Sequence, residues 1–309
     1  MKLEQLRVYK EVASRGSFTA AAEALMMSQP GASLQVKALE AHFGVRLLDR
    51  TAGGVKMTEA GAVVLDAVTT ILAETERMER LVADIRGARS GRIVIAANTT
   101  GGMYVVPPVI AAFREAQPEV DIVLQIEATE RIYERVEQSI VDIALVGGPN
   151  DPERFLVRRF CGDQLVLIAH PGYPLAPQGA VSLSDVARAE LILPEVGSRM
   201  RALVEQTFRD ARLAIRAKLV VSGTEAIKRA VASRLGVGFV SIFAVTEEVR
   251  AGILRIIPLR DADLARNYEL IARKDRYVSP ALAAFTEFAI ARGATLSLPV
   301  PEPRPRAAT

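Results

Sequence analysis

The chain of 309 residues is poor in the residues on which disulfide frameworks, metal sites and most catalytic centres depend. It has one cysteine, Cys161, and two histidines, His42 and His170. A single cysteine excludes a disulfide within the chain and suits a reducing, cytoplasmic compartment. Neither histidine stands at motif spacing from a nucleophile or an orienting acid, and no Walker loop, GxGxxG or CxxC motif occurs. These absences argue against an enzyme and imply no cofactor and no metal site.

Long apolar runs are also absent, since none reaches the roughly 18 residues that a membrane span needs. Charged residues interrupt the amino terminus, which therefore lacks the pattern of a signal peptide. Half of the residues are hydrophobic, enough for sizeable cores, and the length suggests about two domains. The formal net charge is only +3, and residues 1–58 hold eight basic against five acidic side chains. Such a surface can engage phosphates, although a mixed solvated surface gives the same count.

The segment 17–40 reads SFTAAAEALMMSQPGASLQVKALE, which predicts two short helices joined by a tight turn. Ser17 or Thr19 can cap the first helix, and Ser28 can cap the second, which carries Pro30 in its first turn. Small side chains let two helices cross closely, and the first helix offers three of them: Ala21, Ala22 and Ala24. The pattern is typical of a helix-turn-helix.

In a helix-turn-helix the amino-terminal end of the second helix enters the major groove of DNA. The residues predicted to contact DNA there share the first turns of that helix: Ser28, Gln29, Pro30, Ser33 and Lys37. Glutamine can pair bidentately with adenine, and serine can pair with several bases. A compact helical hairpin with no nucleic-acid role is the alternative reading of this segment taken alone.

After Gly44 the pattern predicts a small hairpin, or wing. Its strands are expected at Val45–Leu48 and Val55–Met57, joined by a loop with two glycines. The side chains predicted to reach backbone phosphates are Arg50, Thr51 and Lys56. A surface hairpin with incidental charges is the alternative.

Taken in order, the runs SFTAAAEAL, SQP, QVKALE, FGVRLLDR and MTEAG resemble the amino-terminal domain of LysR-type transcriptional regulators. The similarity continues with correct spacing over nearly the whole chain. It implies a winged helix-turn-helix over residues 1–58 that binds double-stranded promoter DNA as a homodimer or homotetramer. Leu34 stands where family members often carry arginine or lysine, so we expect a DNA contact to be missing there.

From Thr58 the sequence predicts one long helix to about Arg86, within a linker and hinge segment 59–90. Its apolar positions step alternately by four and three residues, with one threonine in the gap, and so form a heptad seam: Val64, Val68, Ile71, Thr75, Met78, Val82 and Ile85. A narrow stripe of this kind is buried against a partner. That partner is either the protein's own second domain or a second subunit, which the resemblance supports.

From Arg92 onward strands and helices alternate, which predicts an α/β fold with largely parallel sheets. The predicted strands are Ile93–Ala97, Val120–Glu127, Asp142–Val146, Leu165–Ala169, Leu191–Leu193, Lys218–Val221, Val237–Val240, Leu254–Pro258 and Tyr268–Ala272. The resemblance implies a two-lobed, periplasmic-binding-protein-like effector domain over 91–293. Lobe one would comprise 92–161 and 267–293, and lobe two 162–266, with two crossing strands as the hinge. The proline-rich segment 294–309 is predicted to be a disordered tail.

Hydroxyl-bearing turns follow several predicted strands, where open α/β sheets bind their ligands. The candidate effector contacts on these turns are Thr99, Thr100, Thr129, Ser198 and Thr224. Ordinary helix capping explains any one of them, but their distribution over both lobes favours a shared cleft. SGTEAIKRAVAS and PEVGSRMR resemble runs in family members that govern sulfur assimilation and carbon fixation, where GSGTR is usual in the second run. Arg199 or Arg201 is therefore an additional candidate, and a small anion or carboxylate is the expected effector.

Two other functions are compatible with parts of the chain. A two-lobed small-solute-binding protein without a gene-regulatory role would account for 92–293, but it leaves the helix-turn-helix, wing and seam without a purpose. A structural nucleoid protein would bind DNA with no sequence preference, whereas a regulator shows a specificity ratio of about 10³ or more.

Overall fold

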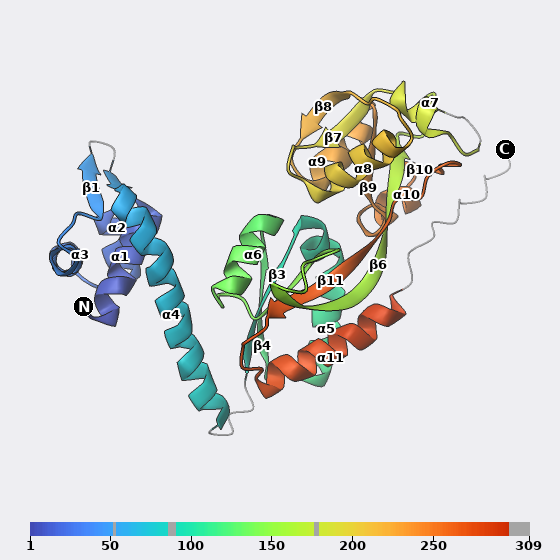
Figure 1. The fold of residues 1–309 in the computed structure, drawn as a ribbon. Helices are drawn as coiled ribbons and strands as arrows, with labels where there is room; N and C mark the ends of the chain where they lie inside the picture. The colour runs from blue at the N-terminus through green and yellow to red at the C-terminus, as the bar shows by residue number, and fades with distance from the viewer. Residues whose placement is uncertain (52–53, 86–90, 176–178, 297–309) are drawn as a thin grey trace. The chain divides into compact units, whose positions relative to one another are not determined.

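The computed structural model describes residues 1–51, 54–85, 91–175 and 179–296. The chain divides into two compact units, formed essentially by residues 1–88 and by residues 89–309 (Figure 1). The end of the predicted linker and hinge segment, residues 86–90, and most of the predicted tail lie outside the described residues. The final helix continues to Thr295. No helix in the described ranges is long and apolar enough to cross a membrane.

The first unit contains a helix-turn-helix. Its elements are α1 (Leu3–Arg15), α2 (Phe18–Ala24), α3 (Gln29–Phe43), β1 (Leu48–Thr51), β2 (Gly54–Met57) and α4 (Glu59–Ile85). The side chains of Ser17 and Ser28 cap α2 and α3 by accepting from Ala20 N and Gly31 N, at 3.3 and 3.2 Å. Ala21 and Ala22 are buried between the helices, but Ala24 is exposed, so the prediction that it forms part of the helix contact is wrong. The closely packed face of α2 is therefore only one turn long.

The wing begins three residues later than the sequence pattern predicts. Leu48–Thr51 pairs antiparallel with Gly54–Met57, and Val45–Leu47 is not a strand. The reason is the side chain of Glu40, which accepts hydrogen bonds from the backbone N–H groups of Leu47 and Leu48 at 2.8 and 3.1 Å. A carboxylate seven residues earlier in the chain thus holds the segment in a non-strand conformation, whatever its β-propensity.

Helix α4 begins after Thr58, whose hydroxyl accepts from Gly61 N at 2.9 Å. The predicted heptad seam does not form one continuous free face on this helix. Val68 and Leu72 are 2% and 5% exposed in the core of the first unit, and Val64 packs against that core. The other described apolar seam positions, Ile71, Met78 and Val82, are 40–58% exposed. The core of the first unit is in contact with Val64, Val68 and Leu72, and no described residue of α4 after Leu72 belongs to it.

The second unit is an α/β structure with one long, twisted path of strands, ordered β4-β3-β5-β11-β6-β9-β7-β8, and β10 paired to β6. Its strands are β3 (Arg92–Ala97), β4 (Asp121–Ile126), β5 (Ile143–Gly147), β6 (Phe155–Ala169), β7 (Leu191–Pro194), β8 (Ala217–Val221), β9 (Val237–Ser241), β10 (Arg255–Ile257) and β11 (Ala265–Arg273). Its helices are α5 (Val106–Ala116), α6 (Thr129–Glu137), α7 (Leu183–Ala187), α8 (Arg199–Asp210), α9 (Thr224–Ala232), α10 (Thr246–Arg250) and α11 (Pro280–Thr295), with the short turns η1 (Gly101–Val105) and η2 (Ile242–Ala244).

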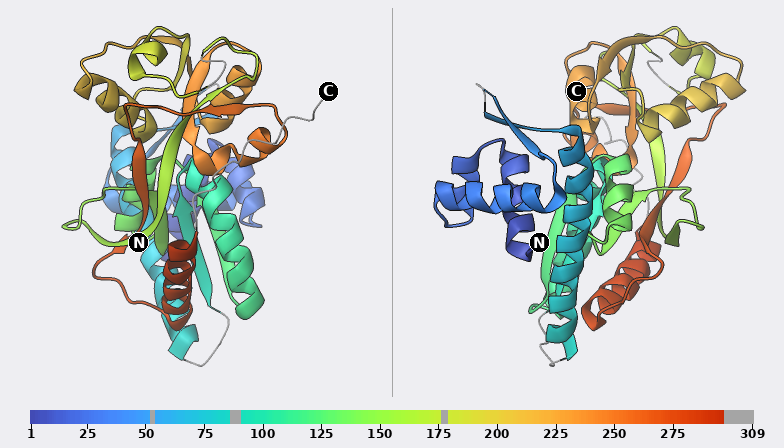
Figure 2. Two further views of the ribbon diagram at one scale, coloured as in Figure 1. Left: turned by 90° about the vertical axis from the view of Figure 1, so that its right-hand side faces the viewer. Right: turned by 60° about the vertical axis from the view of Figure 1, so that its left-hand side comes forward.

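Two lobes share the strands β6 and β11 (Figures 1 and 2). Lobe one is built on β3, β4 and β5, and lobe two on β7, β8 and β9; the pairings within each trio are parallel. The shared strands pair antiparallel from Ala265↔Gln164 to Arg273↔Phe155, with an irregularity after Tyr268. The pattern predicts only the last third of β6, from Leu165, because buried residues alternate with exposed and charged ones in the earlier part of the strand.

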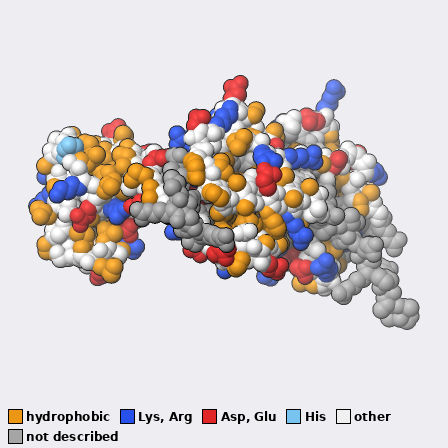
Figure 3. Space-filling model, turned by 90° about the horizontal axis from the view of Figure 1, so that it is seen from below, with side chains coloured by type: hydrophobic (Ala, Val, Ile, Leu, Met, Phe, Trp, Pro, Cys, Tyr) orange, Lys and Arg blue, Asp and Glu red, His pale blue; other side chains and the backbone are white. Residues whose placement is uncertain are grey.

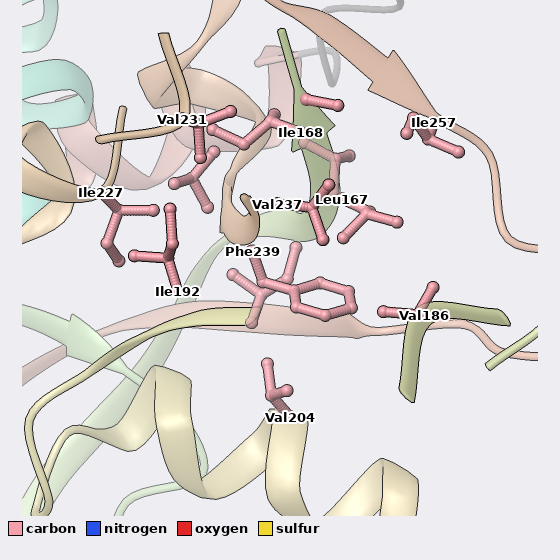
Figure 4. Close-up of a cluster of buried hydrophobic side chains, with 14 of the residues drawn as sticks. Leu167, Ile168, Val186, Ile192, Val204, Ile227, Val231, Val237, Phe239 and Ile257 are labelled. Atoms are coloured by element: carbon pink, nitrogen blue, oxygen red, sulfur yellow. The ribbon is translucent and has the colours of Figure 1, made fainter. Parts of the chain in front are cut away.

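Separate cores stabilise the lobes. In lobe one, α5 and α11 cover one face of the sheet and α6 covers the other, so that side chains such as Phe113 and Ile132 are buried on opposite faces. In lobe two, side chains from β6, β9, α8 and α9 interlock around Phe239 (Figure 4). Two lobes with separate cores, joined by the paired strands β6 and β11, are suited to hinge motion.

Candidate functional site

The exposed face of α3 gathers most of the residues predicted to contact DNA. Gln29, Pro30, Ser33, Leu34 and Lys37 surround one shallow surface hollow of about 310 Å³. Ser28, beside it, is exposed and caps the helix. On the opposite side of α3, Ala32, Val36 and Leu39 are at most 2% exposed and anchor the helix to the core. Leu34 is 67% exposed, so position 34 presents an apolar side chain on the same face as the polar ones.

The three predicted wing contacts lie on the β1–β2 hairpin. Thr51 is exposed and donates to Gly54 O at 3.2 Å, and Lys56 is exposed opposite Asp49. Arg50 lies in β1 opposite Val55, while its side chain is outside the described part of the chain. Basic and acidic side chains are interspersed on the face drawn in Figure 3. The small net charge is therefore not gathered on that face into one basic patch.

All five predicted effector contacts line one cavity of about 350 Å³ in the second unit. Thr99, Thr100 and Thr129 come from lobe one, and Ser198 and Thr224 from lobe two. Three α-helices begin at this cavity, α6 at Thr129, α8 at Arg199 and α9 at Thr224. Helix amino termini present free N–H groups and a positive dipole end, which suit an anionic group.

Thr100 and Thr224 meet across the two lobes. Their hydroxyl oxygens lie 3.1 Å apart, and the residues are only 8% and 3% exposed. A second cross-lobe contact lies nearby, where Tyr104 OH of lobe one donates to the carboxylate of Glu225 in lobe two. Lys228 Nζ, buried in lobe two, lies 2.6 and 2.7 Å from carboxylate oxygens of Glu225 and Glu248. Buried hydrogen bonds thus tie the lobes together beside the cavity.

The two additional arginine candidates separate. Arg199 lines the cavity, and its guanidinium bonds to lobe one. Arg201 points into its own lobe, where it pairs with Glu205 at 2.7 Å and donates to Pro194 O at 2.9 Å. It is not among the residues that line the cavity. Only Arg199 is therefore placed to meet a ligand.

Arg266 is a cavity residue that the sequence pattern does not reveal. It lies in β11, with its side chain 11% exposed, and pairs with the fully buried Asp163 of β6 at 2.7 Å. Asp163 also accepts from the Ser241 hydroxyl at 2.6 Å. The predicted strand begins at Tyr268, which leaves Arg266 in a loop. Only the pairing of the two crossing strands reveals this charge at the floor of the cavity.

Cys161 is buried in β6, where burial, and after it the nearby Asp163 carboxylate, raises the pKa of the thiol to about 12. We therefore expect no reaction of the native protein with a thiol reagent at neutral pH, and one reactive thiol after denaturation.

Because the pKa of the Cys161 thiol in the folded protein lies above the ordinary 9.0, this thiol stabilises the fold fully below about pH 9. That contribution is lost as the pH rises toward 12. Urea unfolding of wild type and Cys161→Ala at several alkaline pH values measures how the free energy of unfolding of each depends on pH. The same pH dependence in both proteins would contradict the contribution of the thiol.

Comparison with known proteins agrees with this architecture. The model of the bacterial regulatory helix-turn-helix proteins of the lysR family matches residues 3–62, and that of the LysR substrate binding domain matches residues 86–294. The chain is 34% identical over 312 residues to a probable RuBisCO transcriptional regulator of Cyanophora paradoxa, covering 99% of this chain and 95% of that one. It is 35% identical over 308 residues to the HTH-type transcriptional regulator CbbR of Sinorhizobium medicae, covering 99% and 97%.

Among solved structures, full-length CbnR in complex with its target DNA has the same fold. The TM-score is 0.75 at 24% identity, over 95% of this chain and 100% of that one. The helix-turn-helix unit, the two-lobed domain and these relatives lead to one conclusion: the chain belongs to the LysR family of transcriptional regulators.

Proposed function

We propose that the protein regulates transcription by binding a specific promoter sequence through α3 and the wing, under the control of a small acidic effector bound between its lobes. The observation that carries the regulatory part is the convergence of five hydroxyl residues from both lobes on one cavity. The protein would act in the cytoplasm, without catalysis. A ligand shifts such a system only through unequal affinity for two arrangements of the protein.

The exposed end of α3 supports direct reading of bases. Gln29 and Ser33 border the same hollow as Lys37, so base-pairing groups and a phosphate-seeking cation share one face. Ser28 and Pro30 begin the helix at that face. The proposed division of labour assigns base readout to Gln29 and Ser33, and backbone contacts to Lys37 and the wing.

The exposed stripe of α4 supports pairing of two chains. Ile71, Met78 and Val82 are 40%, 58% and 45% exposed, and Val63 is 70% exposed. Met78 and Val82 lie further along α4 than Leu72, the last described residue of this helix in the core of the first unit. We propose this stripe as the dimer contact, because a two-fold DNA site requires two recognition helices.

Base readout is tested with duplexes selected by the wild-type protein from a random-sequence pool. Gln29→Ala and Ser33→Ala proteins are expected to lose roughly 1–3 kcal/mol of discrimination against single-base changes at the positions they read. His42→Ala, an exposed change at the far end of α3, is the matched control and should keep the wild-type preference. Unchanged preference in both variants would remove these residues from base readout and overturn the proposed reading head.

The effector cavity is tested separately by thermal unfolding in a panel of small metabolite acids. Thr100→Val combined with Thr224→Val should abolish stabilisation by any acid that stabilises wild type, while basal DNA affinity stays the same. Thr207→Val is the control, because that hydroxyl donates to Leu203 O within its own helix, outside the cavity. An acid that stabilises the double variant as well as wild type binds elsewhere, and such a result would reject the cavity as its site.

A further inference from the structure

Arg199, the first residue of α8, gives every hydrogen bond it makes in the described structure to the other lobe. Its Nη1 donates to Tyr133 OH at 2.5 Å, Gly147 O at 2.7 Å and Asn150 Oδ1 at 3.1 Å. Its Nη2 donates to Pro149 O at 2.7 Å. Arg199 is therefore part of lobe two, but its guanidinium is hydrogen-bonded to lobe one.

All four acceptors are neutral oxygens. Within the described ranges, no carboxylate lies within 4 Å of the Arg199 guanidinium. The other two cations at the junction of the lobes differ in this respect, since Arg266 pairs with Asp163, and Lys228 with two glutamates. Arg199 is thus a cation at the cavity wall with no counter-ion among the described residues.

The guanidinium also has donors to spare. An arginine has five N–H donors, and the contacts of Arg199 leave the Nε–H and one Nη2–H without an acceptor in the described residues. Arg199 lines both the effector cavity and a second cavity of about 400 Å³ beside Gly147–Pro149. Arg199 is therefore part of the wall of the effector cavity as well as of the junction between the lobes.

The acidic side chains that line the effector cavity do not act as the counter-ion of Arg199. Glu127 is engaged by Arg135 at 2.8 Å. Glu130 and Glu195 line the cavity but are exposed, and neither lies within ion-pair distance of Arg199. A planar, always-charged guanidinium binds a carboxylate or phosphate through paired, charge-assisted hydrogen bonds that are roughly twice as strong as neutral ones.

We propose that Arg199 couples occupancy of the cavity to closure of the lobes: an oxyanion group of the effector pairs with its spare donors while its other donors hold lobe one. This rests on the effector cavity proposed above and adds the residue that selects an acid and transmits its binding. Because lobe one holds the guanidinium in place, the anion meets this geometry only in the closed arrangement. Its binding free energy then favours closure.

The first test measures thermal unfolding of the full-length protein by circular dichroism, since the chain has no tryptophan. Acetate, malonate and inorganic phosphate are titrated separately against sodium chloride of equal ionic strength, which distinguishes a carboxylate from a phosphate source. At least one of them should raise the unfolding temperature of wild type and of Arg201→Ala, the matched arginine two residues away. Arg199→Gln should weaken the apparent Kd by about tenfold or more. Arg199→Lys should recover part of the loss, because it restores the charge without the fork.

Two outcomes overturn the proposal in this test. One is that none of the three oxyanions stabilises wild type beyond chloride. The other is that Arg199→Gln responds to the stabilising oxyanion as strongly as wild type does.

The second test measures lobe closure by single-molecule energy transfer between dyes on Glu115→Cys in lobe one and Ser233→Cys in lobe two, both exposed positions. One labelled chain is mixed with excess unlabelled protein, and the native Cys161 is buried. The stabilising oxyanion should narrow the distance distribution in wild type and Arg201→Ala but not in Arg199→Gln. A purely structural role would change the ligand-free distribution and leave the anion response intact, and that result would reject the coupling.

Neither test uses DNA, so failure of the α3 reading head leaves them unaffected. The double variant Thr100→Val, Thr224→Val distinguishes failure of the proposed cavity from failure of the proposed role of Arg199. If it loses the anion response while Arg199→Gln keeps it, the cavity stands and the role of Arg199 is rejected.

Discussion

Replacement of Arg266 by leucine is expected to lower the free energy of unfolding of the second unit by about 3–5 kcal/mol. Leucine removes the cation from Asp163, whose side chain is fully buried and lies 2.7 Å from the arginine Nε. In the described structure, the buried carboxylate would then keep only the Ser241 hydroxyl and the backbone N–H of Gln164, which donate to its Oδ1 at 2.6 and 2.8 Å. Urea denaturation followed by circular dichroism measures the loss.

A second substitution tests the electrostatic origin of this loss. The double variant Arg266→Leu, Asp163→Asn should recover much of the lost stability, because no uncompensated charge remains buried. Arg209→Leu is the control for removing an arginine, since that side chain is 60% exposed and its pair with Glu205 is loose at 3.9 Å. A loss below about 1 kcal/mol for Arg266→Leu would show that Asp163 does not depend on its partner.

The substitution Gly61→Ala is expected to destabilise the first unit by about 3 kcal/mol while leaving the second unit folded. A Cβ at Gly61 would lie 2.1 Å from Leu47 O and 3.1 Å from the hydroxyl of Tyr9. Neither neighbour can easily retreat. Leu47 O accepts from Thr58 N at 3.0 Å, and the buried Tyr9 donates to Gly61 O at 2.6 Å. The start of α4 must therefore move away from the helix-turn-helix.

Hydrogen exchange resolved by peptide measures the two units separately. Faster exchange is expected in α1, α3 and the start of α4, with unchanged protection in β6 and β11. Gly162→Ala is the control, because a Cβ there meets nothing within 4 Å. Wild-type protection of the first unit in Gly61→Ala would contradict the tight contact between the start of α4 and Leu47.

Local patterns were sufficient for much of the fold. The caps at Ser17 and Ser28 were visible in the sequence because a hydroxyl at a helix start acts on a backbone group three residues away. The alternation of strands and helices after Arg92 predicted an α/β fold with largely parallel sheets for the same reason, since each strand–helix unit is local. The predicted strand boundaries were wrong where a contact from another element set the end of a strand. Glu40 delays the first wing strand, and pairing with β11 extends β6 by ten residues beyond its predicted start.

The apolar seam of α4 shows, within one helix, what a local pattern predicts and what it does not. Its apolar period was correct, but period alone does not say which partner buries which residue. The core of the first unit takes Val68 and Leu72, and the side of α4 that carries Met78 stays exposed.

By itself the sequence determined the family, the order of the domains and the hydroxyl residues that border the cavity, because these depend on short motifs and on periodicity along the chain. Only the tertiary structure decided which charges the site contains. It paired Arg266 with Asp163 and placed Arg201 against Glu205 of its own lobe. It left Arg199 bridging both lobes, with no carboxylate in the described ranges as its counter-ion. The partner of a charged side chain is set by the three-dimensional meeting of segments that lie dozens of residues apart, and no local pattern records that meeting.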